Sequence, residues 1–272
     1  MSHEPTESTG RVREKISVRG LSKVFGSHNS TFSALEDFNL SVDEGEFVCI
    51  VGPSGCGKTT ALRILAGLED ASGGTAEIIS GAPGQQPVNS MVFQEQSLFP
   101  WLSVIDNAAF GLEMRGASRK ERYRLTEPYL EMVGLQKFRN HFPSQLSGGM
   151  KQRVSLARAF ANDPEVLLMD EPFAALDAQN KLILQDELLR IWETHRKTVL
   201  FITHSIDEAI ALGDRVVVMT ASPGRIKDEV RVDFERPRDI VSLMTSPEFG
   251  EMSLRIWRTL EDEVRKARLH DA

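Results

Sequence analysis

The chain has 272 residues, enough for one sizeable core with a subdomain or an appended tail. Hydrophobic residues make up 41% of it and charged residues 26%, the proportions of an ordinary globular protein. Because 39 acidic residues outnumber 32 basic ones, the composition argues against a protein built mainly to coat nucleic acid. Its two cysteines, Cys49 and Cys56, lie too close together for a disulfide framework, which favours a reducing compartment.

The first residues of the chain are polar and charged, and they lack the apolar stretch of a signal peptide. We therefore expect a disordered lead over 1–14. No apolar run in the sequence approaches the roughly 20 residues that a helix needs to cross a bilayer. A role at a membrane is therefore expected to depend on a membrane-bound partner.

The first predicted elements surround a glycine-rich loop. Alternating apolar and polar residues over 38–42 predict a half-buried strand, and the continuously apolar FVCIV (47–51) predicts a strand covered on both faces. The segment TTALRILAG is expected to form a helix that ends at Gly67. Glycine, proline and asparagine predict a loop over 81–90.

Helices and strands alternate further along the chain. Ser103 and Asp106 have the spacing of a capping box for a helix running to about residue 112. Ser118 is expected to cap a second helix toward Gly134, with Pro128 kinking or splitting it. Strands are predicted from the apolar runs VLLMD (166–170), TVLFITH (198–204) and RVVVM (215–219). This alternation predicts an α/β core with a mainly parallel sheet.

The sequence GPSGCGKTT fits the phosphate-binding pattern G-x-x-x-x-G-K-[ST] and joins an apolar strand to a helix, the context that supports the match. Its glycines let backbone N–H groups surround phosphate oxygens, Lys58 reaches the β- and γ-phosphates, and the Thr59 hydroxyl ligates Mg²⁺. Cys56, at a helix N-terminus beside Lys58, is expected to favour the thiolate. The residues predicted to bind nucleotide here are Gly52, Pro53, Ser54, Gly55, Cys56, Gly57, Lys58, Thr59 and Thr60.

Two carboxylates stand at the end of the strand predicted at 166–170, at the edge where open α/β sheets bind ligands. Asp170 is predicted to hold Mg²⁺, and Glu171 to accept a proton from the attacking water or to polarise it. His204 ends the next apolar run and reaches the same edge. From its position alone, contact with a γ-phosphate and a purely structural place are equally compatible with His204.

A second anion-binding loop lies in LSGGMKQRVSLARAFAND (146–163). Ser147, Gly148 and Gly149 offer a hydroxyl and backbone N–H groups at the mouth of a predicted helix. The alternative is that Ser147 only caps this helix.

Taken in order, GPSGCGKTT, VFQE, LSGGMKQR, VLLMDEPFAALD and ITH resemble the ATPase subunit of ABC transporters over roughly residues 16–235. The resemblance implies a P-loop NTPase fold of the ABC ATPase type, with a mainly parallel core sheet, an antiparallel β-subdomain and a helical subdomain inserted over about 97–157. It implies an ATPase domain over 15–235, a C-terminal helical tail over 236–272, and ATP and Mg²⁺ as ligands.

The same resemblance implies roles for single residues. His204 becomes the switch histidine, and Gln94 becomes the Q-loop glutamine, which approaches Mg²⁺ and the attacking water. Asp177 becomes the aspartate that helps to organise the dimer interface. Phe25 falls where the family carries an aromatic residue that stacks on adenine, the alternative being a core phenylalanine.

In that family, two subunits hold two ATP molecules head to tail, and each LSGG loop caps the γ-phosphate bound by the other subunit. Ser147, Gly148 and Gly149 are therefore expected to act on ATP bound by a second copy of this chain. Met150 stands where the commonest form has glutamine, but it leaves the Ser-Gly-Gly intact.

In the family that this chain resembles, the region matching FQEQSLFPWLSVIDNAAFGL (93–112) forms part of the cleft that receives a permease's cytoplasmic coupling helix. Its large apolar residues, Leu98, Phe99, Trp101 and Leu102, surround a proline, and filling the helical subdomain's own core is the alternative role. The implied partners are two permease subunits, contacted around Phe99 and Trp101, and indirectly a solute-binding protein, without nucleic acid. The implied location is peripheral, on the cytoplasmic face of the inner membrane.

Two further stretches, VMTASPGRIKDEVRVDFERPRD and DEPFAALDAQNK, look most like the nitrate, sulfonate and taurine group of bacterial importers, although Asn180, Lys181 and Pro128 depart from it. The predicted function is ATP hydrolysis that powers uptake of a small solute. A soluble ABC ATPase of DNA repair or translation usually has two cassettes or a long coiled-coil insertion. A small-molecule kinase would leave LSGGM and Asp177 unexplained.

The tail contains a predicted helix that begins at Ser246 and Pro247. Apolar residues follow at helical spacing, with Trp257 beside them: Phe249, Met252, Ile256, Leu260 and Val264. Packing against the chain's own core is expected, and contact with a second subunit is the alternative.

Overall fold

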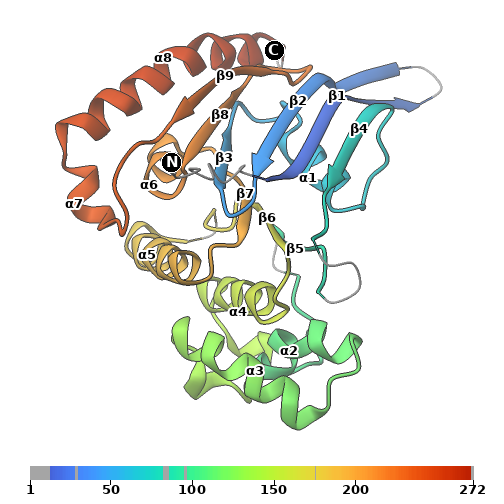
Figure 1. The fold of residues 1–272 in the computed structure, drawn as a ribbon, viewed down its shortest axis with the longest axis vertical. Helices are drawn as coiled ribbons and strands as arrows, with labels where there is room; N and C mark the ends of the chain where they lie inside the picture. Colours follow the sequence, from blue (N-terminus) through green and yellow to red (C-terminus); the bar gives the residue numbers. More distant parts are fainter. Residues whose placement is uncertain (1–12, 28–29, 82–85, 95–96, 175, 271–272) are drawn as a thin grey trace, which may run out of the picture.

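A computed structural model describes residues 13–27, 30–81, 86–94, 97–174 and 176–270. Its described elements form a six-stranded sheet, a three-stranded sheet and a group of helices below them in Figure 1. The disordered lead predicted over 1–14 falls outside the described residues up to residue 12, and strand β1 begins at Glu14.

The six-stranded sheet has the order β5-β6-β7-β3-β8-β9. Five of its strands are parallel, and β9 pairs antiparallel with β8. The strands are β3 (Phe47–Val51), β5 (Asn89–Val92), β6 (Val166–Asp170), β7 (Thr198–Ile202), β8 (Arg215–Met219) and β9 (Ile226–Arg231). Every residue of β3, β6 and β7 is buried, which explains their continuous apolar runs. The loop predicted over 81–90 is wrong at its end, because β5 begins at Asn89, which pairs with Val166.

The second sheet is antiparallel, with β1 (Glu14–Ser27) between β2 (Ser30–Asp43) and β4 (Gly73–Ile78). It shares a core with helix α1 (Lys58–Leu65) and with one face of the six-stranded sheet. Leu21 and Phe38 from this sheet pack there with Leu62 of α1 and Ile50 of β3. The strand predicted over 38–42 is therefore the end of the longer strand β2.

The helical group contains α2 (Val104–Met114), α3 (Arg119–Met132), the short turns η1 (Gln136–Phe138) and η2 (Pro143–Gln145), and α4 (Gly148–Ala161). Ser103 caps α2 as predicted, because its hydroxyl accepts from the backbone N–H of Asp106 at 3.2 Å. The predicted split of this helix at Pro128 is wrong, because α3 runs through Pro128. Packing of the buried Leu130 and Val133 in the core of this group holds the last turn helical although Pro128 removes one backbone donor.

The other face of the six-stranded sheet is covered by α5 (Ala178–His195), α6 (Ile206–Leu212), α7 (Ile240–Met244) and α8 (Pro247–His270) (Figure 1). Phe249, Ile256 and Leu260 of α8 are buried in the same core as Trp192 and Phe201. The tail therefore packs on the chain's own core. Among the described helices, none is both long and apolar enough to cross a bilayer.

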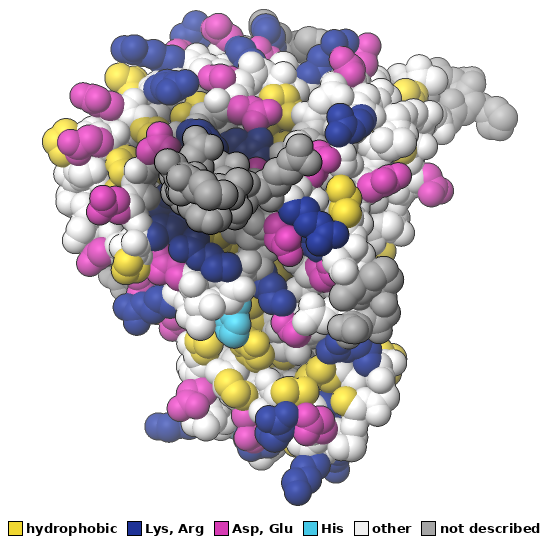
Figure 2. Space-filling model, in the orientation of Figure 1, with side chains coloured by type: hydrophobic (Ala, Val, Ile, Leu, Met, Phe, Trp, Pro, Cys, Tyr) yellow, Lys and Arg dark blue, Asp and Glu magenta, His cyan; other side chains and the backbone are white. Residues whose placement is uncertain are grey.

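The segment that leads into this tail is held by two arginines. The Arg238 guanidinium is buried and donates to the carbonyl oxygens of Ala211 at 3.1 Å and Gly213 at 2.8 Å, at the end of α6. The Arg236 guanidinium lies 4.2 Å from the Trp192 ring centroid. On the face drawn in Figure 2, acidic and basic side chains are interspersed, and apolar ones gather over the helical group.

Candidate nucleotide-binding site

The glycine-rich loop over 52–57 joins β3 to α1 and folds around the amino group of Lys58. Gly57 caps α1 with a φ of 94°, a left-handed conformation that favours glycine. The Lys58 Nζ donates to the carbonyl oxygens of Gly52 at 2.8 Å and Pro53 at 2.9 Å, and the residue is only 6% exposed. The loop thus surrounds a buried cation at the N-terminus of a helix, the arrangement that binds phosphate.

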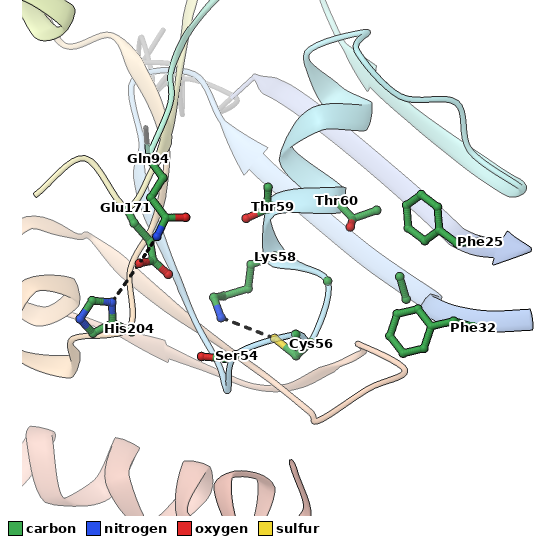
Figure 3. Close-up of a pocket in the computed structure, with 13 residues that line it drawn as sticks. Phe25, Phe32, Ser54, Cys56, Lys58, Thr59, Thr60, Gln94, Glu171 and His204 are labelled. Atoms are coloured by element: carbon green, nitrogen blue, oxygen red, sulfur yellow. Dashed lines mark hydrogen bonds and ion pairs between the residues drawn. The ribbon is translucent and has the colours of Figure 1, made fainter. Parts of the chain in front are cut away.

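A cavity of about 530 Å³ opens above this loop. Figure 3 shows that side chains from three parts of the fold face it: the loop and α1, the β1–β2 hairpin, and the ends of β5, β6 and β7. Its lining residues are Phe25, Phe32, Ala34, Ser54, Gly55, Cys56, Gly57, Lys58, Thr59, Thr60, Gln94, Glu171 and His204. Most of the residues predicted for the nucleotide and its hydrolysis therefore meet in one place.

Asp170 ends β6, and its carboxylate accepts a hydrogen bond at 3.0 Å from the hydroxyl of Thr59, a residue that lines the cavity. Burial raises the pKa of Asp170, the Thr59 hydrogen bond opposes this, and the neighbouring Glu171 charge raises it further. A buried carboxylate with a raised pKa needs a cation nearby to favour its charged form. One carboxylate and one hydroxyl are hard oxygen donors, so Asp170 and Thr59 fit a Mg²⁺ ion.

Glu171 is the centre of a group formed by three adjacent strand ends. Its Oε2 lies 3.1 Å from the Nδ1 of His204 and accepts a long hydrogen bond of 3.5 Å from the Nε2 of Gln94. Its φ of 43° is uncommon for a residue with a side chain, and its backbone N–H donates to the carbonyl oxygen of Ile202 at 3.0 Å. Glu171 is therefore held by its backbone and its side chain at the cavity wall, opposite Lys58 and Thr59 (Figure 3).

Two phenylalanines line the far end of the cavity. Phe25 of β1 and Phe32 of β2 are directly paired across the hairpin, and they are 40% and 52% exposed. Phe25 is therefore not a core residue, and the Lys23 ammonium lies 4.8 Å from its ring centroid. Phe32 is a candidate that sequence reasoning missed. The register of a long hairpin, which places Phe32 opposite Phe25, is the signal that could have found it.

The second glycine loop and Asp177 lie outside the cavity lining. Ser147 caps α4, since its hydroxyl accepts from the Met150 N–H at 3.3 Å. Asp177 caps α5 and accepts from the backbone N–H of Asn180 at 3.1 Å and from its side chain at 2.7 Å. These hydrogen bonds, that from the Asn180 side chain first, lower the pKa of Asp177. A Cβ on Gly149 would come within 2.9 Å of Leu176, so the two segments adjoin.

The residues that depart from the importer pattern have structural partners. Asn180 binds the capping carboxylate of Asp177, and Lys181 forms an ion pair with the buried Glu208. These contacts fix the first turn of α5 behind Asp177.

The expected thiolate at Cys56 is wrong. The residue is 1% exposed, and this burial raises the pKa of the thiol, although the Lys58 charge opposes the shift. Burial removes the solvation that a thiolate needs, and a cation whose Nζ lies 3.7 Å from the sulfur does not replace it.

The apolar segment over 98–102 forms a fixed platform on the helical group. Phe99 is half-buried, with its ring 4.5 Å from that of Phe110 and 5.5 Å from that of Trp101. The buried Asn107 side chain bonds both the N–H and the carbonyl of Phe99, at 2.8 Å and 3.0 Å, and the carbonyl of Leu102 at 2.9 Å. Trp101, by contrast, is 70% exposed. Phe99 thus belongs to the fold of this group, and Trp101 offers free apolar surface.

Comparison with known proteins identifies the family. Residues 35–174 match the family described as ABC transporter. An uncharacterized ABC transporter ATP-binding protein of Methanocaldococcus jannaschii is 50% identical over 94% of this chain and 95% of its own length. The chain belongs to the ABC transporter family.

Other members of this family carry more specific names. A nitrate import ATP-binding protein of Synechococcus elongatus is 45% identical over 85% of each chain. An aliphatic sulfonates import ATP-binding protein of Bacillus cereus is 41% identical over 90% of this chain and 96% of its own. The predicted similarity to this importer group is therefore confirmed.

A solved ABC cassette has the same fold. It is described as the dimeric structure of a post-hydrolysis state bound to ADP and Pi, and it superposes with a TM-score of 0.72 at 33% identity, covering 81% of this chain and 100% of its own. The predicted P-loop NTPase fold of the ABC ATPase type is confirmed, and the chain is an ATP-binding ABC ATPase.

Proposed function

We propose that this chain is the ATP-hydrolysing subunit of an import complex that drives the uptake of a small solute, such as nitrate, a sulfonate or taurine, through separate permease subunits. Its relatives named for nitrate and aliphatic sulfonate import support this. The observation that carries the hydrolytic part is the Glu171 carboxylate, held beside His204 and Gln94 and facing Lys58 across one cavity.

Each group has a task in this hydrolysis. The loop over 52–60 and Lys58 bind the β- and γ-phosphates, while Thr59 and Asp170 hold Mg²⁺, which neutralises phosphate charge when bound. Glu171 orients a water and accepts its proton as the water oxygen bonds to the γ-phosphorus and the bond to ADP breaks. Gln94 and His204 hold the Glu171 carboxylate and contact the water and the γ-phosphate.

The base of ATP lies against the aromatic pair of the hairpin in this proposal. Phe25 and Phe32 both face the cavity beyond α1, and stacking on a π-face is worth about 1–3 kcal/mol per base. The Lys23 ammonium, which donates to Glu69 at 2.7 Å, lies 4.8 Å from the Phe25 ring centroid and holds this ring in place.

The chain works as a head-to-tail homodimer. Ser147, Gly148, Gly149 and Asp177 lie outside their own cavity lining, so a second copy is needed to bring such a loop over a bound γ-phosphate. The N-terminus of α4 would then direct its dipole at that phosphate. A solved ABC cassette of the same fold is described as dimeric, which supports this arrangement.

The dimer lies under two permease subunits, on the cytoplasmic face of the inner membrane, and serves a solute-binding protein indirectly. Trp101, exposed on the platform of Phe99 and Asn107, is the proposed permease contact. In the domain division that we propose, the ATPase domain covers 15–235 and the helical tail covers 236–272.

The decisive experiment replaces Glu171 by glutamine. This change keeps the side chain's size but removes the proton acceptor, so hydrolysis should fall by roughly 10²-fold or more while ATP affinity is kept. ATP should then hold two subunits together long enough to be seen as a dimer by size. The matched control is Glu121→Gln, an exposed carboxylate of α3 that pairs with Arg124 and should leave turnover unchanged.

Turnover like that of the unmodified chain in Glu171→Gln would contradict the proposed base. Isolation of the chain from membranes together with an integral membrane protein separates the importer from a soluble ABC ATPase. The complex is sought both in the cells of origin and after co-expression of the chain with the neighbouring permease genes. If neither source yields it, the proposed role in transport is wrong, while the proposed ATP hydrolysis is unaffected.

A further inference from the structure

One buried carboxylate of the tail helix is bound to the turn that joins β8 to β9. Glu263 of α8 is 2% exposed and accepts hydrogen bonds from the backbone N–H of Ala221 at 2.9 Å, from Lys227 at 2.9 Å and from Lys266 at 2.8 Å. Burial alone would raise the pKa of Glu263, but these bonds outweigh it and lower the pKa to about 2. The carboxylate is thus charged and fully engaged at this turn.

The opposite side of the same turn contacts the nucleotide loop. The Ser222 hydroxyl donates to the carbonyl of Ser33 at 3.1 Å, and the Gly224 N–H donates to that of Ala34 at 2.9 Å, so the turn is bonded to β2. Gly224 also lies directly against the glycine-rich loop, since a Cβ there would overlap the carbonyl oxygen of Cys56. No side chain separates the turn from the loop at this point.

A second hollow, of about 500 Å³, lies on the surface beside this turn and the glycine-rich loop. It is lined by Ala267 of α8, by Pro223 of the turn, by Ser54 and Gly55 of the loop, and by Phe32. The end of α8 therefore lies beside the wall of the nucleotide cavity, although Ala267 and Ser54 are far apart in the sequence.

We propose that Glu263 is a positioning residue for ATP binding. By fixing Ala221, it holds the turn over 220–225 against Cys56 and against the strand that carries Phe32, so that α8 sets the shape of the phosphate-binding loop. The inference rests on the proposed ATP site, and it gives the tail a task beyond covering the sheet. Glu263 reaches the ligand through the turn and touches no phosphate itself.

The test compares Glu263→Gln with a variant that only weakens the tail. The amide replaces the charged acceptor of the Ala221 N–H by a neutral and weaker one, and it no longer attracts Lys227 and Lys266. The turn that holds Ala221 should therefore loosen. We expect the Kd for ATP to rise roughly 2- to 30-fold, the range of energetic coupling through such networks. The matched control is Leu260→Ala, which removes buried apolar packing from the same helix but no hydrogen bond to the turn.

The melting temperature of each variant is measured first, and the Kd for ATP is then measured well below it. The proposal requires a higher Kd in Glu263→Gln and an unchanged Kd in Leu260→Ala, even where the second variant melts at a lower temperature. Glu261→Gln, which removes an exposed pair with Arg265 on the same helix, should change neither quantity.

An unchanged Kd in Glu263→Gln, or the same rise in both variants, would show that α8 contributes only stability. The unmodified chain and Lys58→Ala distinguish this from a failure of the ATP site itself. If the unmodified chain binds ATP and Lys58→Ala does not, the site is present and only the role of Glu263 is in question.

Discussion

Replacing Trp101 by serine tests the proposed permease contact most directly. A tryptophan buries about 200 Å² when fully covered, and Trp101 is 70% exposed, so about 140 Å² remains for a partner to cover. At about 25 cal/mol per Å², this area is worth up to about 3.5 kcal/mol, or roughly a 400-fold weaker assembly when it is lost. Such a value is typical of the few anchor residues that dominate an interface.

The same substitution should have only a small effect on the stability of the free subunit. The remaining covered area of Trp101 amounts to about 60 Å², or about 1.5 kcal/mol, which shifts the melting temperature by a few degrees. Phe99→Ser should behave differently, because the Phe99 ring packs on Phe110 within the helical group. We expect Phe99→Ser to destabilise the free subunit, and Trp101→Ser to leave its ATP affinity intact.

The assay is paired. Co-purification with the permease and solute uptake are measured beside the ATP affinity and melting temperature of the free subunit. Trp257→Ser is the control, since this tryptophan is 44% exposed on α8, at the opposite end of the molecule from α2 (Figure 1). If Trp101→Ser assembles and transports normally, the docking surface lies elsewhere. Loss of ATP binding or of folding would instead make Trp101 part of the fold.

Three further outcomes follow from the site and the tail. Phe32→Ala should weaken ATP binding by about 1–3 kcal/mol while leaving the affinity for inorganic triphosphate unchanged. Val24→Ala, on the same hairpin, should alter neither affinity. Equal losses for both ligands would show that Phe32 does not stack on the adenine base. Alkylation of Cys56 at neutral pH should be slower than that of a free cysteine, because burial raises the pKa of its thiol, and bound ATP should slow it further; rapid labelling would contradict the burial. Because the pKa of Glu263 is lowered to about 2, its stabilisation is present above the ordinary pKa of about 4.5 and is lost as the pH falls toward 2. Acid denaturation should therefore be less steep in Glu263→Gln, and parallel curves would refute this.

The central strands and the phosphate loop could be predicted because their physics is local. Strands β3, β6 and β7 are buried on both faces, so each is a continuous apolar run in the sequence. Parallel pairing then brings their carboxyl ends to one edge, which places Glu171 and His204 together as the sequence suggested. The loop before Lys58 is indicated by its own glycines and by the helix that follows them.

The features that escaped prediction depend on residues distant in the chain. Strand β5 is short and only half-buried over most of its length, and its place beside β6 gives it a strand conformation that its composition does not indicate. The charge expected on Cys56 follows from Lys58 and the helix, but burial under the turn at Gly224 outweighs both. Phe32 required the hairpin register, and the contact of Glu263 with Ala221 required the packing of the tail.

The proposed division of the ATP site between two copies of the chain has a testable consequence. Lys58 lies in the cavity of its own chain, whereas Ser147 lies outside it, so a head-to-tail dimer contains two composite sites, each with Lys58 of one copy and Ser147 of the other. Lys58→Ala and Ser147→Arg should each inactivate both sites of a homodimer. In a mixed dimer the two lesions meet in one site and leave the other intact. Equal mixing should therefore restore about a quarter of the full activity if the sites act independently.

Mixtures as inactive as the two parent variants would mean that both sites must act together or that the head-to-tail arrangement is wrong. ATP-dependent crosslinking of Ser147→Cys to Ser54→Cys decides between these, since both native cysteines are buried, and absence of a crosslink would reject the composite site.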